Sequence, residues 1–115
     1  MGVSHVKNIK GISMNGNNDV MKKILISSEE GWQDYVMRLF EINPGEDNCS
    51  PKHSHEWPHI IYIVEGNGII HLDGTDHEVE AGSYAYIPGG KIHQLANTGT
   101  ERFSFICIVP SEGEV

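Results

Sequence analysis

Three of the seven histidines in this 115-residue chain lie within seven residues, in the stretch PKHSHEWPH (51–59). In an extended strand, residues two apart point to the same side, so His53 and His55 should project together, about 6 to 7 Å apart at Cα. Two imidazoles at that separation can bind one metal ion through bonds of about 2.0 to 2.2 Å. Pro58 is expected to end the extended segment, which allows His59 to enter the same cavity from the next strand.

A fourth histidine, His93, follows a glycine-rich turn in IPGGKIHQLAN (87–97). The other histidines have no partner at a comparable spacing, so we expect them to be ordinary surface or core residues. They are His5, His71 and His77. The chain has neither the glycine pattern of a dinucleotide-binding loop nor a GxSxG nucleophile turn. Metal binding is therefore the chemistry that the sequence best supports.

The composition argues against several other functions. The chain has 8 basic and 16 acidic residues and a net charge of -8, whereas nucleic-acid binding requires clustered Lys and Arg. Its apolar runs are too short to span a bilayer, and its first residues lack the apolar region of a secretion signal. Cys49 and Cys107 form no CxxC pair or disulfide framework, which is typical of a reducing compartment. We expect a cytoplasmic single-domain protein that binds neither nucleic acid nor membrane.

Short β-branched and aromatic runs, separated by turns rich in Gly, Asn and Asp, predict an antiparallel β sandwich or small barrel. The runs are KKILIS (22–27), YVMRLFEI (35–42), HIIYIVEG (59–66), GIIHLDG (68–74), SYAYIPG (83–89) and FSFICIVP (103–110). Asp73-Gly74 predicts a tight hairpin, and Ser27 to Glu30 support at most one helical turn. The first twenty residues are polar. They form either a disordered tail, which the sequence alone favours, or a strand that joins a neighbour's sheet.

Two sequence motifs resemble those of the cupin superfamily. The second cupin motif, G(x)5PxG(x)2H(x)3N, is met at every position, by Gly82, Pro88, Gly90, His93 and Asn97. The first, G(x)5HxH(x)3–4E(x)6G, is met by His53, His55 and Gly66, with His59 in place of the glutamate and Gly45 displaced. The 15 residues from Asn67 to Ala81 separate the motifs, which is the short spacing of compact bacterial cupins.

This resemblance, over about residues 35 to 110, implies an all-β fold, the antiparallel cupin barrel that is also called a double-stranded β-helix or jelly roll. The chain is similar to a subgroup of small single-domain bacterial cupins in which histidine replaces the glutamate. That subgroup implies a manganese-type metal and a homodimer that exchanges N-terminal strands. Here the exchanged segment would be residues 1–34, the barrel residues 35–115, and the four metal ligands His53, His55, His59 and His93.

Four neutral imidazoles would leave the full charge of a divalent ion uncompensated, which favours anionic or oxygen-donor small molecules. An octahedral Mn²⁺ or Fe²⁺ would keep two positions for ligand, water or dioxygen. Zn²⁺ prefers four ligands and would form a closed structural site. We therefore expect one divalent metal per chain, manganese first, with Fe, Zn, Ni and Cu as alternatives.

Five further residues are candidates for the pocket around the metal. Phe105 and Cys107 share one face of FSFICIV, where Cys107 is either a soft metal ligand or an ordinary core cysteine. Tyr86 either hydrogen-bonds a ligand or simply packs. Arg38 either meets an anionic substrate or forms a salt bridge at the rim, and Trp57 is either a lid or a loop plug.

The leading functional hypothesis is a metal-dependent oxidoreductase, dioxygenase-like, that acts on a small organic molecule at the open metal positions. One alternative is a binding or sensing module that captures a small anion without turnover. Another is an isomerase or lyase in which the metal stabilises an enolate. Cupins host many unrelated chemistries, so the fold does not choose among these functions.

Overall fold

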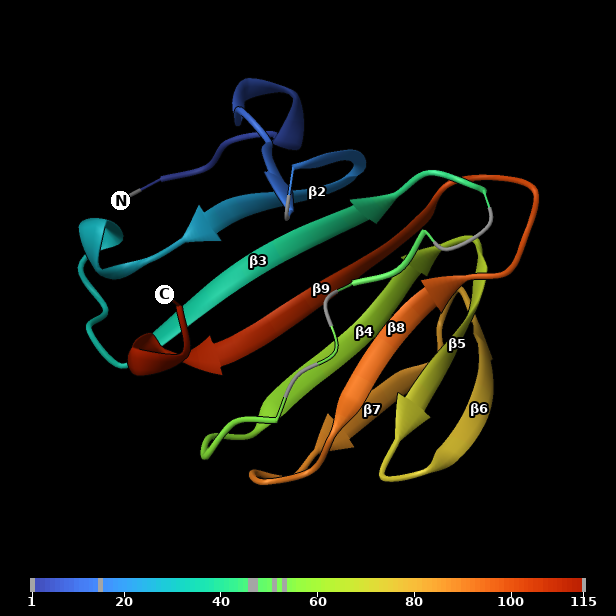
Figure 1. The fold of residues 1–115 in the computed structure, drawn as a ribbon. Helices are drawn as coiled ribbons and strands as arrows, with labels where there is room; N and C mark the ends of the chain where they lie inside the picture. Colours follow the sequence, from blue (N-terminus) through green and yellow to red (C-terminus); the bar gives the residue numbers. More distant parts are fainter. Residues whose placement is uncertain (1, 15, 46–47, 51, 53, 115) are drawn as a thin grey trace.

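The structure is a computed structural model that describes residues 2–14, 16–45, 48–50, 52 and 54–114. Within them the chain forms two antiparallel β-sheets and three short 3₁₀ turns (Figure 1). The strands are β1 (Ile12–Met14), β2 (Asn17–Ile26), β3 (Tyr35–Ile42), β4 (His59–Glu65), β5 (Asn67–Leu72), β6 (Thr75–Glu80), β7 (Tyr84–Ile87), β8 (His93–Asn97) and β9 (Phe103–Pro110). The turns are η1 (Val6–Asn8), η2 (Ser28–Glu30) and η3 (Ser111–Gly113).

One sheet has the strand order β1-β2-β3-β9-β4-β7 and the other the order β6-β5-β8. Alternate side chains of each inner strand point into the space between the sheets. In β9 this alternation buries Phe103, Phe105, Cys107 and Val109, and in β4 it buries His59, Ile61 and Ile63. The core is built from these inward faces together with Ile70 of β5 and Leu95 of β8. The expected all-β antiparallel barrel is confirmed.

Every predicted strand run overlaps a strand of the structure, and the runs 35–42 and 103–110 have the predicted bounds. The sequence patterns miss β1, β6 and β8. β6 reads TDHEVE and β8 reads HQLAN, so neither is a run of β-branched or aromatic residues. Both become strands because each pairs with one edge of β5, and such pairing overrides local propensity.

The segment before β4 is irregular, and the expectation that His55 lies in a strand is wrong. The described residues 52 and 54–58 carry no strand structure, and β4 begins at His59. The expectation that a new strand starts at His59 is confirmed, whereas residues 54–57 form no strand for Pro58 to end.

Two local turns follow the predicted turn chemistry. The β5–β6 hairpin turns at Asp73 and Gly74, whose φ angles are 49° and 84°, the left-handed values of a two-residue type I′ turn. Ser27 caps η2 through a capping box with Glu30, and the turn ends at Gly31. The single helical turn is therefore confirmed.

The N-terminal part of the chain extends the larger sheet, because β2 pairs with β3 and β1 pairs with β2. The expectation of disorder is wrong for residues 12–14 and 17–20. Exchange of residues 1–34 with a second copy, and the division at residue 35, stay predictions. Among the described residues no helix is long and apolar enough to cross a membrane.

Candidate metal centre

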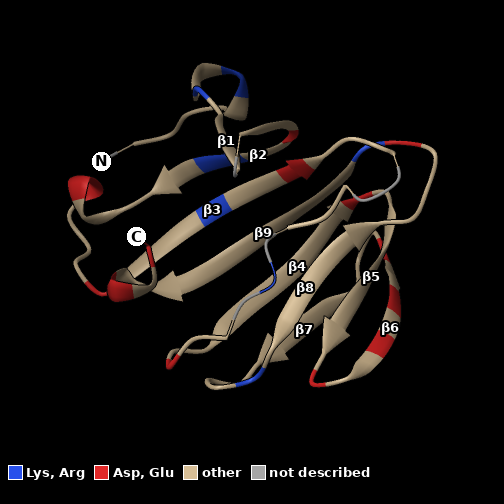
Figure 2. Cartoon of the chain, viewed as in Figure 1, with Lys and Arg blue, Asp and Glu red and all other residues tan. Residues whose placement is uncertain are grey.

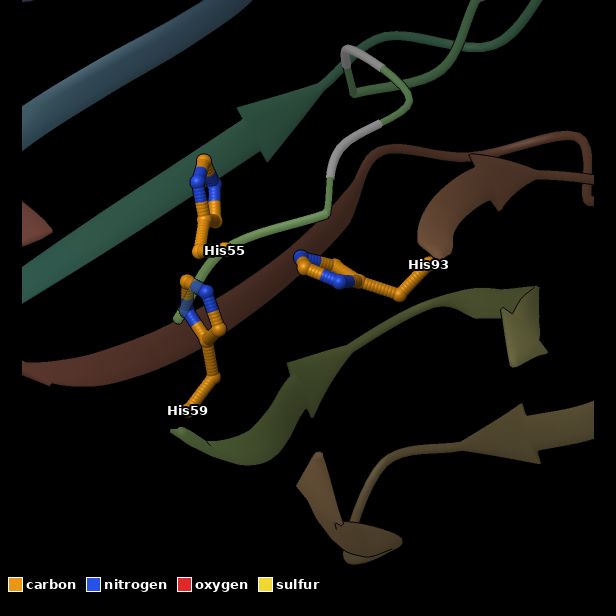
Figure 3. Close-up of side chains that lie close together, drawn as sticks. All are labelled: His55, His59 and His93. Carbon is orange, nitrogen blue, oxygen red and sulfur yellow. The ribbon is translucent and has the colours of Figure 1, made fainter. Parts of the chain in front are cut away.

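Three histidines from different parts of the chain meet in one place. The ring nitrogens that His55, His59 and His93 can offer to a metal lie within 4.8 Å of one another. Their ring centroids are separated by 4.7 Å for His59 and His93, and by 5.3 Å and 5.7 Å for His55 with His59 and His93. Figure 3 shows the three rings pointing toward a common space. Nitrogens bound to one ion lie up to about 4.4 Å apart, so small side-chain movements would bring all three onto one ion.

The two sheets hold two of these histidines on facing strands. His59 is the first residue of β4, in the larger sheet, and His93 is the first residue of β8, in the smaller one. Strand alternation points both side chains inward, and each is only 6 % exposed. His53, the fourth expected ligand, lies outside the described residues.

A glycine turn positions His55, which no strand holds. The backbone N–H of Gly90 donates to the carbonyl of His55, and Gly90 has a φ of 83°, which favours glycine. A Cβ on Gly89 would lie 2.1 Å from the carbonyl oxygen of Glu56, so only glycine allows this close approach. The sequence PGG (88–90) is therefore the connecting turn that was predicted, and it also fixes the histidine-bearing loop.

Hydrogen bonds and burial set the imidazoles up as ligands. The Nδ1 of His93 lies 3.0 Å from the Lys91 carbonyl oxygen, and an N–H at Nδ1 specifies the tautomer whose Nε2 carries the lone pair for a metal. The Nδ1 of His59 lies 3.3 Å from Cys107 Sγ. Burial, and then the positive charges of His93 and Arg38, lower the pKa of His55, which favours its neutral, metal-binding form.

The histidines line a cavity of about 130 Å³ between the sheets. Its walls are largely apolar and include Phe40, Ile61 and Leu95. Lys22 of β2 and Arg38 of β3 also line the cavity and contribute positive charge; both are 7 % exposed. A cavity of this kind, small and apolar with a few convergent polar groups, is the usual form of a small-molecule site.

Arg38 connects the histidines to a carboxylate at the far end of the chain. Its Nη2 donates to Cys107 Sγ at 3.0 Å and its Nη1 to Glu114 Oε1 at 3.1 Å. Lys22 Nζ donates to Glu114 Oε2 at 2.6 Å. The contacts therefore run in order from His59 through Cys107 and Arg38 to Glu114 and Lys22.

Phe105, Cys107 and Arg38, three of the predicted pocket residues, line the cavity. Arg38 faces the interior rather than the rim. Burial raises the pKa of the Cys107 thiol, and its contact with His59 Nδ1 places Cys107 to orient that imidazole. Trp57 stacks on the ring of His55, with centroids 5.1 Å apart and planes 10° apart.

The structure places Tyr86, a predicted pocket residue, outside the cavity, and its role toward a ligand stays a prediction. Tyr86 points away from the core on the outer face of β7, is 63 % exposed and does not line the cavity. Conversely, sequence reasoning missed Lys22 and Glu114. For Lys22 a signal existed, since strand alternation places it on the inward face between Val20 and Ile24. For Glu114 no sequence signal pointed to the site.

The donor set fits a divalent metal ion. Neutral imidazoles suit Mn, Fe, Zn, Ni and Cu alike, so three clustered histidines indicate a metal site without identifying the metal. Beyond the histidines, the carboxylate of Glu114 pairs with Lys22 and Arg38.

Comparison with known proteins agrees with the fold. Residues 38–109 match the family described as Cupin domain. The chain is 33 % identical over 95 residues to the dimethylsulfoniopropionate lyase DddW of Ruegeria pomeroyi, a match that covers 77 % of this chain and 61 % of the lyase. It is 29 % identical over 107 residues to an oxalate-binding protein of Thermotoga maritima, covering 90 % of this chain and 83 % of that protein.

Among solved structures, the polyketide cyclase RemF of Streptomyces resistomycificus aligns with a TM-score of 0.84 at 28 % sequence identity. The alignment covers 96 % of this chain and 80 % of the cyclase. The three relatives are described by different activities, so the likeness extends to the barrel and does not single out one reaction.

Proposed function

Because the chain belongs to the cupin family, we propose that it binds one divalent metal ion through His55, His59 and His93 and holds a small organic anion at that ion. The observation that carries this proposal is the convergence of three imidazoles in a cavity that also contains the buried cations Lys22 and Arg38. The names of two relatives, a lyase that acts on dimethylsulfoniopropionate and an oxalate-binding protein, support a small ligand that carries a carboxylate.

We propose His53 as the fourth ligand, on its spacing from His55, and manganese as the metal. An all-imidazole shell carries no negative charge, so the ion would keep its full divalent charge. When bound, such an ion supplies Lewis-acid chemistry, which orients an oxygen-donor ligand and stabilises developing negative charge. This shell therefore favours anionic ligands more than a shell that includes glutamate.

The other cavity residues would bind and orient the anion. Arg38 and Lys22 supply positive charge in a region from which water is largely excluded, where charge interactions are strong. The apolar surfaces of Phe40 and Ile61 shape the remaining space. These residues select a small ligand with a negatively charged end and an apolar body.

If the chain catalyses a reaction, a lyase or isomerase reaction through an enolate fits these residues better than the dioxygenase-like reaction. A positive cavity stabilises an enolate directly, and one relative is a lyase. The oxidoreductase hypothesis stays a prediction, tested by oxygen uptake with candidate carboxylates under Mn and Fe loading. An anion that binds without turnover would instead make the chain a binding module.

Metal content tests the proposal. Protein prepared without a nickel column should hold about one ion per chain after loading with Mn²⁺, and oxalate should change the electron paramagnetic resonance spectrum of the bound Mn²⁺. His59→Ala should lower Mn²⁺ affinity by at least about tenfold. His77→Ala, on the exposed strand β6, is the matched control and should bind like wild type. A protein that binds no metal, or a His59→Ala variant that binds it unchanged, would contradict the proposal.

We further propose that a second copy of the chain covers the outer face of the larger sheet. Its outward residues on β4 and β7 are apolar or aromatic although they are 45 % to 83 % exposed. They are Ile60, Tyr62, Val64, Tyr84 and Tyr86. Ile60 is paired with Tyr86 and Tyr62 with Tyr84, so the patch is continuous, and continuous apolar patches mark contact surfaces. Two chains of charge -8 repel each other, so an uncharged face is where they can meet.

Light scattering after size exclusion tests this dimer. The wild-type chain should have the mass of a dimer, and Tyr62→Glu, which buries a charge at the centre of the patch, should have the mass of a monomer. Thr75→Glu adds the same charge on exposed β6 and should leave the dimer intact. A monomeric wild-type chain, or a dimeric Tyr62→Glu variant, would contradict the proposed interface.

A further inference from the structure

A single carboxylate bridges the two buried cations of the cavity. Glu114 accepts from Lys22 Nζ at 2.6 Å with one oxygen and from Arg38 Nη1 at 3.1 Å with the other. Lys22 and Arg38 lie on neighbouring strands, and both point inward. Figure 2 shows basic residues on β2 and β3 beside the acidic segment that follows β9. The carboxylate of a small ligand would make these same contacts.

Arg38 also keeps a donor for which the described residues offer no acceptor. Its Nε is buried and has no hydrogen-bond partner among them, whereas Nη1 and Nη2 are used by Glu114 and Cys107. A buried N–H without an acceptor is costly and rare in folded proteins. With two cations and one carboxylate, the group also keeps one positive charge. Glu114 therefore satisfies this pair of cations only in part, in charge and in hydrogen bonds, so the pair can still attract a competing carboxylate.

We propose, building on the proposed function, that Lys22 and Arg38 form a second anion subsite beside the histidine cluster. The subsite takes the second acidic group of a small dicarboxylate or similar diacid whose first group binds at the metal. Glu114 is the internal occupant of this subsite, and the ligand must displace it. The chain therefore selects against monocarboxylates through the cations and regulates its own affinity through Glu114.

The segment that carries Glu114 also packs over the histidine loop. A Cβ on Gly113 would lie 2.6 Å from Trp57 Nε1, so the backbone of η3 touches the indole. The indole in turn stacks on His55. Displacement of Glu114 would therefore change the environment of the Trp57 indole, and the fluorescence of Trp57 would report this change.

Titration of dicarboxylates into the full chain loaded with Mn²⁺ tests the subsite. Malonate, succinate and glutarate give a series of lengths, and propionate is the monocarboxylate reference. Glu114→Gln removes the charge of the internal occupant but keeps its shape. Glu112→Gln, exposed on the turn η3 that Glu114 follows, is the matched control.

For each variant we compare the ratio of its affinity for the best dicarboxylate to its affinity for propionate. This ratio should be about tenfold higher in Glu114→Gln than in wild type, and Glu112→Gln should match wild type. The double variant Lys22→Gln/Glu114→Gln should lose this gain. In metal-free protein, calorimetry should detect dicarboxylate binding to Glu114→Gln that is weaker or absent in wild type. Dicarboxylate addition should also change Trp57 fluorescence in wild type but change it less in Glu114→Gln.

The outcomes separate the subsite from the proposed function. If the spectrum of bound Mn²⁺ responds to anions but all variants prefer dicarboxylates over propionate equally, the subsite is overturned and the proposed function stands. A gain that survives loss of Lys22 would also overturn it. A chain that binds no Mn²⁺ refutes the proposed function, and the metal-free titration then decides the subsite by itself.

Discussion

Replacement of Cys107 is the sharpest test of how the cavity supports the metal ligands. Cys107 Sγ lies 3.3 Å from His59 Nδ1 and 3.0 Å from Arg38 Nη2, in a side chain that is 3 % exposed. Cys107→Ala removes both contacts. It leaves His59 without this partner and exposes a second Arg38 donor to an apolar void.

The expected loss in affinity follows from the chemistry of the partner. Removing a group that orients a metal-binding histidine costs about 10- to 100-fold in metal affinity. Sulfur is a weak hydrogen-bond partner, so we expect the lower end, about tenfold, which is about 1.4 kcal/mol. Cys107→Ser keeps a small group able to donate and accept, so its Mn²⁺ affinity should fall by less than about threefold.

Titration of Mn²⁺ into metal-free protein, followed by the resonance signal of free Mn²⁺, measures these affinities. Cys49→Ala is the matched control, because Cys49 Sγ also accepts a hydrogen bond, from Gln94 at 3.2 Å, but does not line the cavity. Equal affinities for wild type and Cys107→Ala would refute the orienting role. Equal losses in the serine and alanine variants would instead make the sulfur itself a metal ligand.

Two further predictions concern stability. Asn97 donates hydrogen bonds to Ile42 O at 2.9 Å and to Glu101 O at 2.8 Å, and it accepts one from Gly99 N at 2.9 Å. Because Asn97→Ala removes all three, the free energy of unfolding should fall by about 3 kcal/mol and the melting temperature by about 10 °C. Exposed Asn43→Ala is the control, and a shift of similar size in that variant would contradict the assignment. The hydrogen bond from Ser104, then Arg102, lowers the pKa of Glu65 from its ordinary 4.5. Glu65 therefore stabilises the fold above that pH and loses its contribution as the pH falls through the lowered value. Because the side chain is partly exposed, the effect should be below about 1 kcal/mol, seen as a shallower acid-side loss of stability in Glu65→Gln by chemical denaturation; parallel pH profiles would refute it.

Local patterns were enough to predict the elements that bury an apolar face. β3 and β9 pair along their whole length and have the bounds that their alternation predicts. β6 could not be found in this way, because nearly all its residues are exposed at the edge of the smaller sheet. Its strand conformation comes from pairing with β5, a contact that the sequence of β6 alone does not encode.

The site was predictable where spacing and motif carried the information, and not where distant segments meet. His55, His59 and His93 come together as expected, although His55 reaches the site from a loop fixed by Gly89 and Gly90 rather than from a strand. The contact of Glu114 with Lys22 joins residues 92 positions apart. No local pattern encodes such a contact, because it depends on how the segment after β9 returns over the cavity.

The charges of the cavity explain why loss of the family's glutamate matters. His59 stands where the motif has that carboxylate, so the proposed all-histidine shell would contribute no negative charge. Glu114 brings a carboxylate to the cavity, but this carboxylate accepts hydrogen bonds from Lys22 and Arg38. These three side chains together keep one positive charge; once a ligand displaces Glu114, Lys22, Arg38 and a divalent ion at the histidines would together carry about four. Buried charge of that size needs a compensating anion, and a dicarboxylate that binds at both ends supplies more of it than a monocarboxylate can.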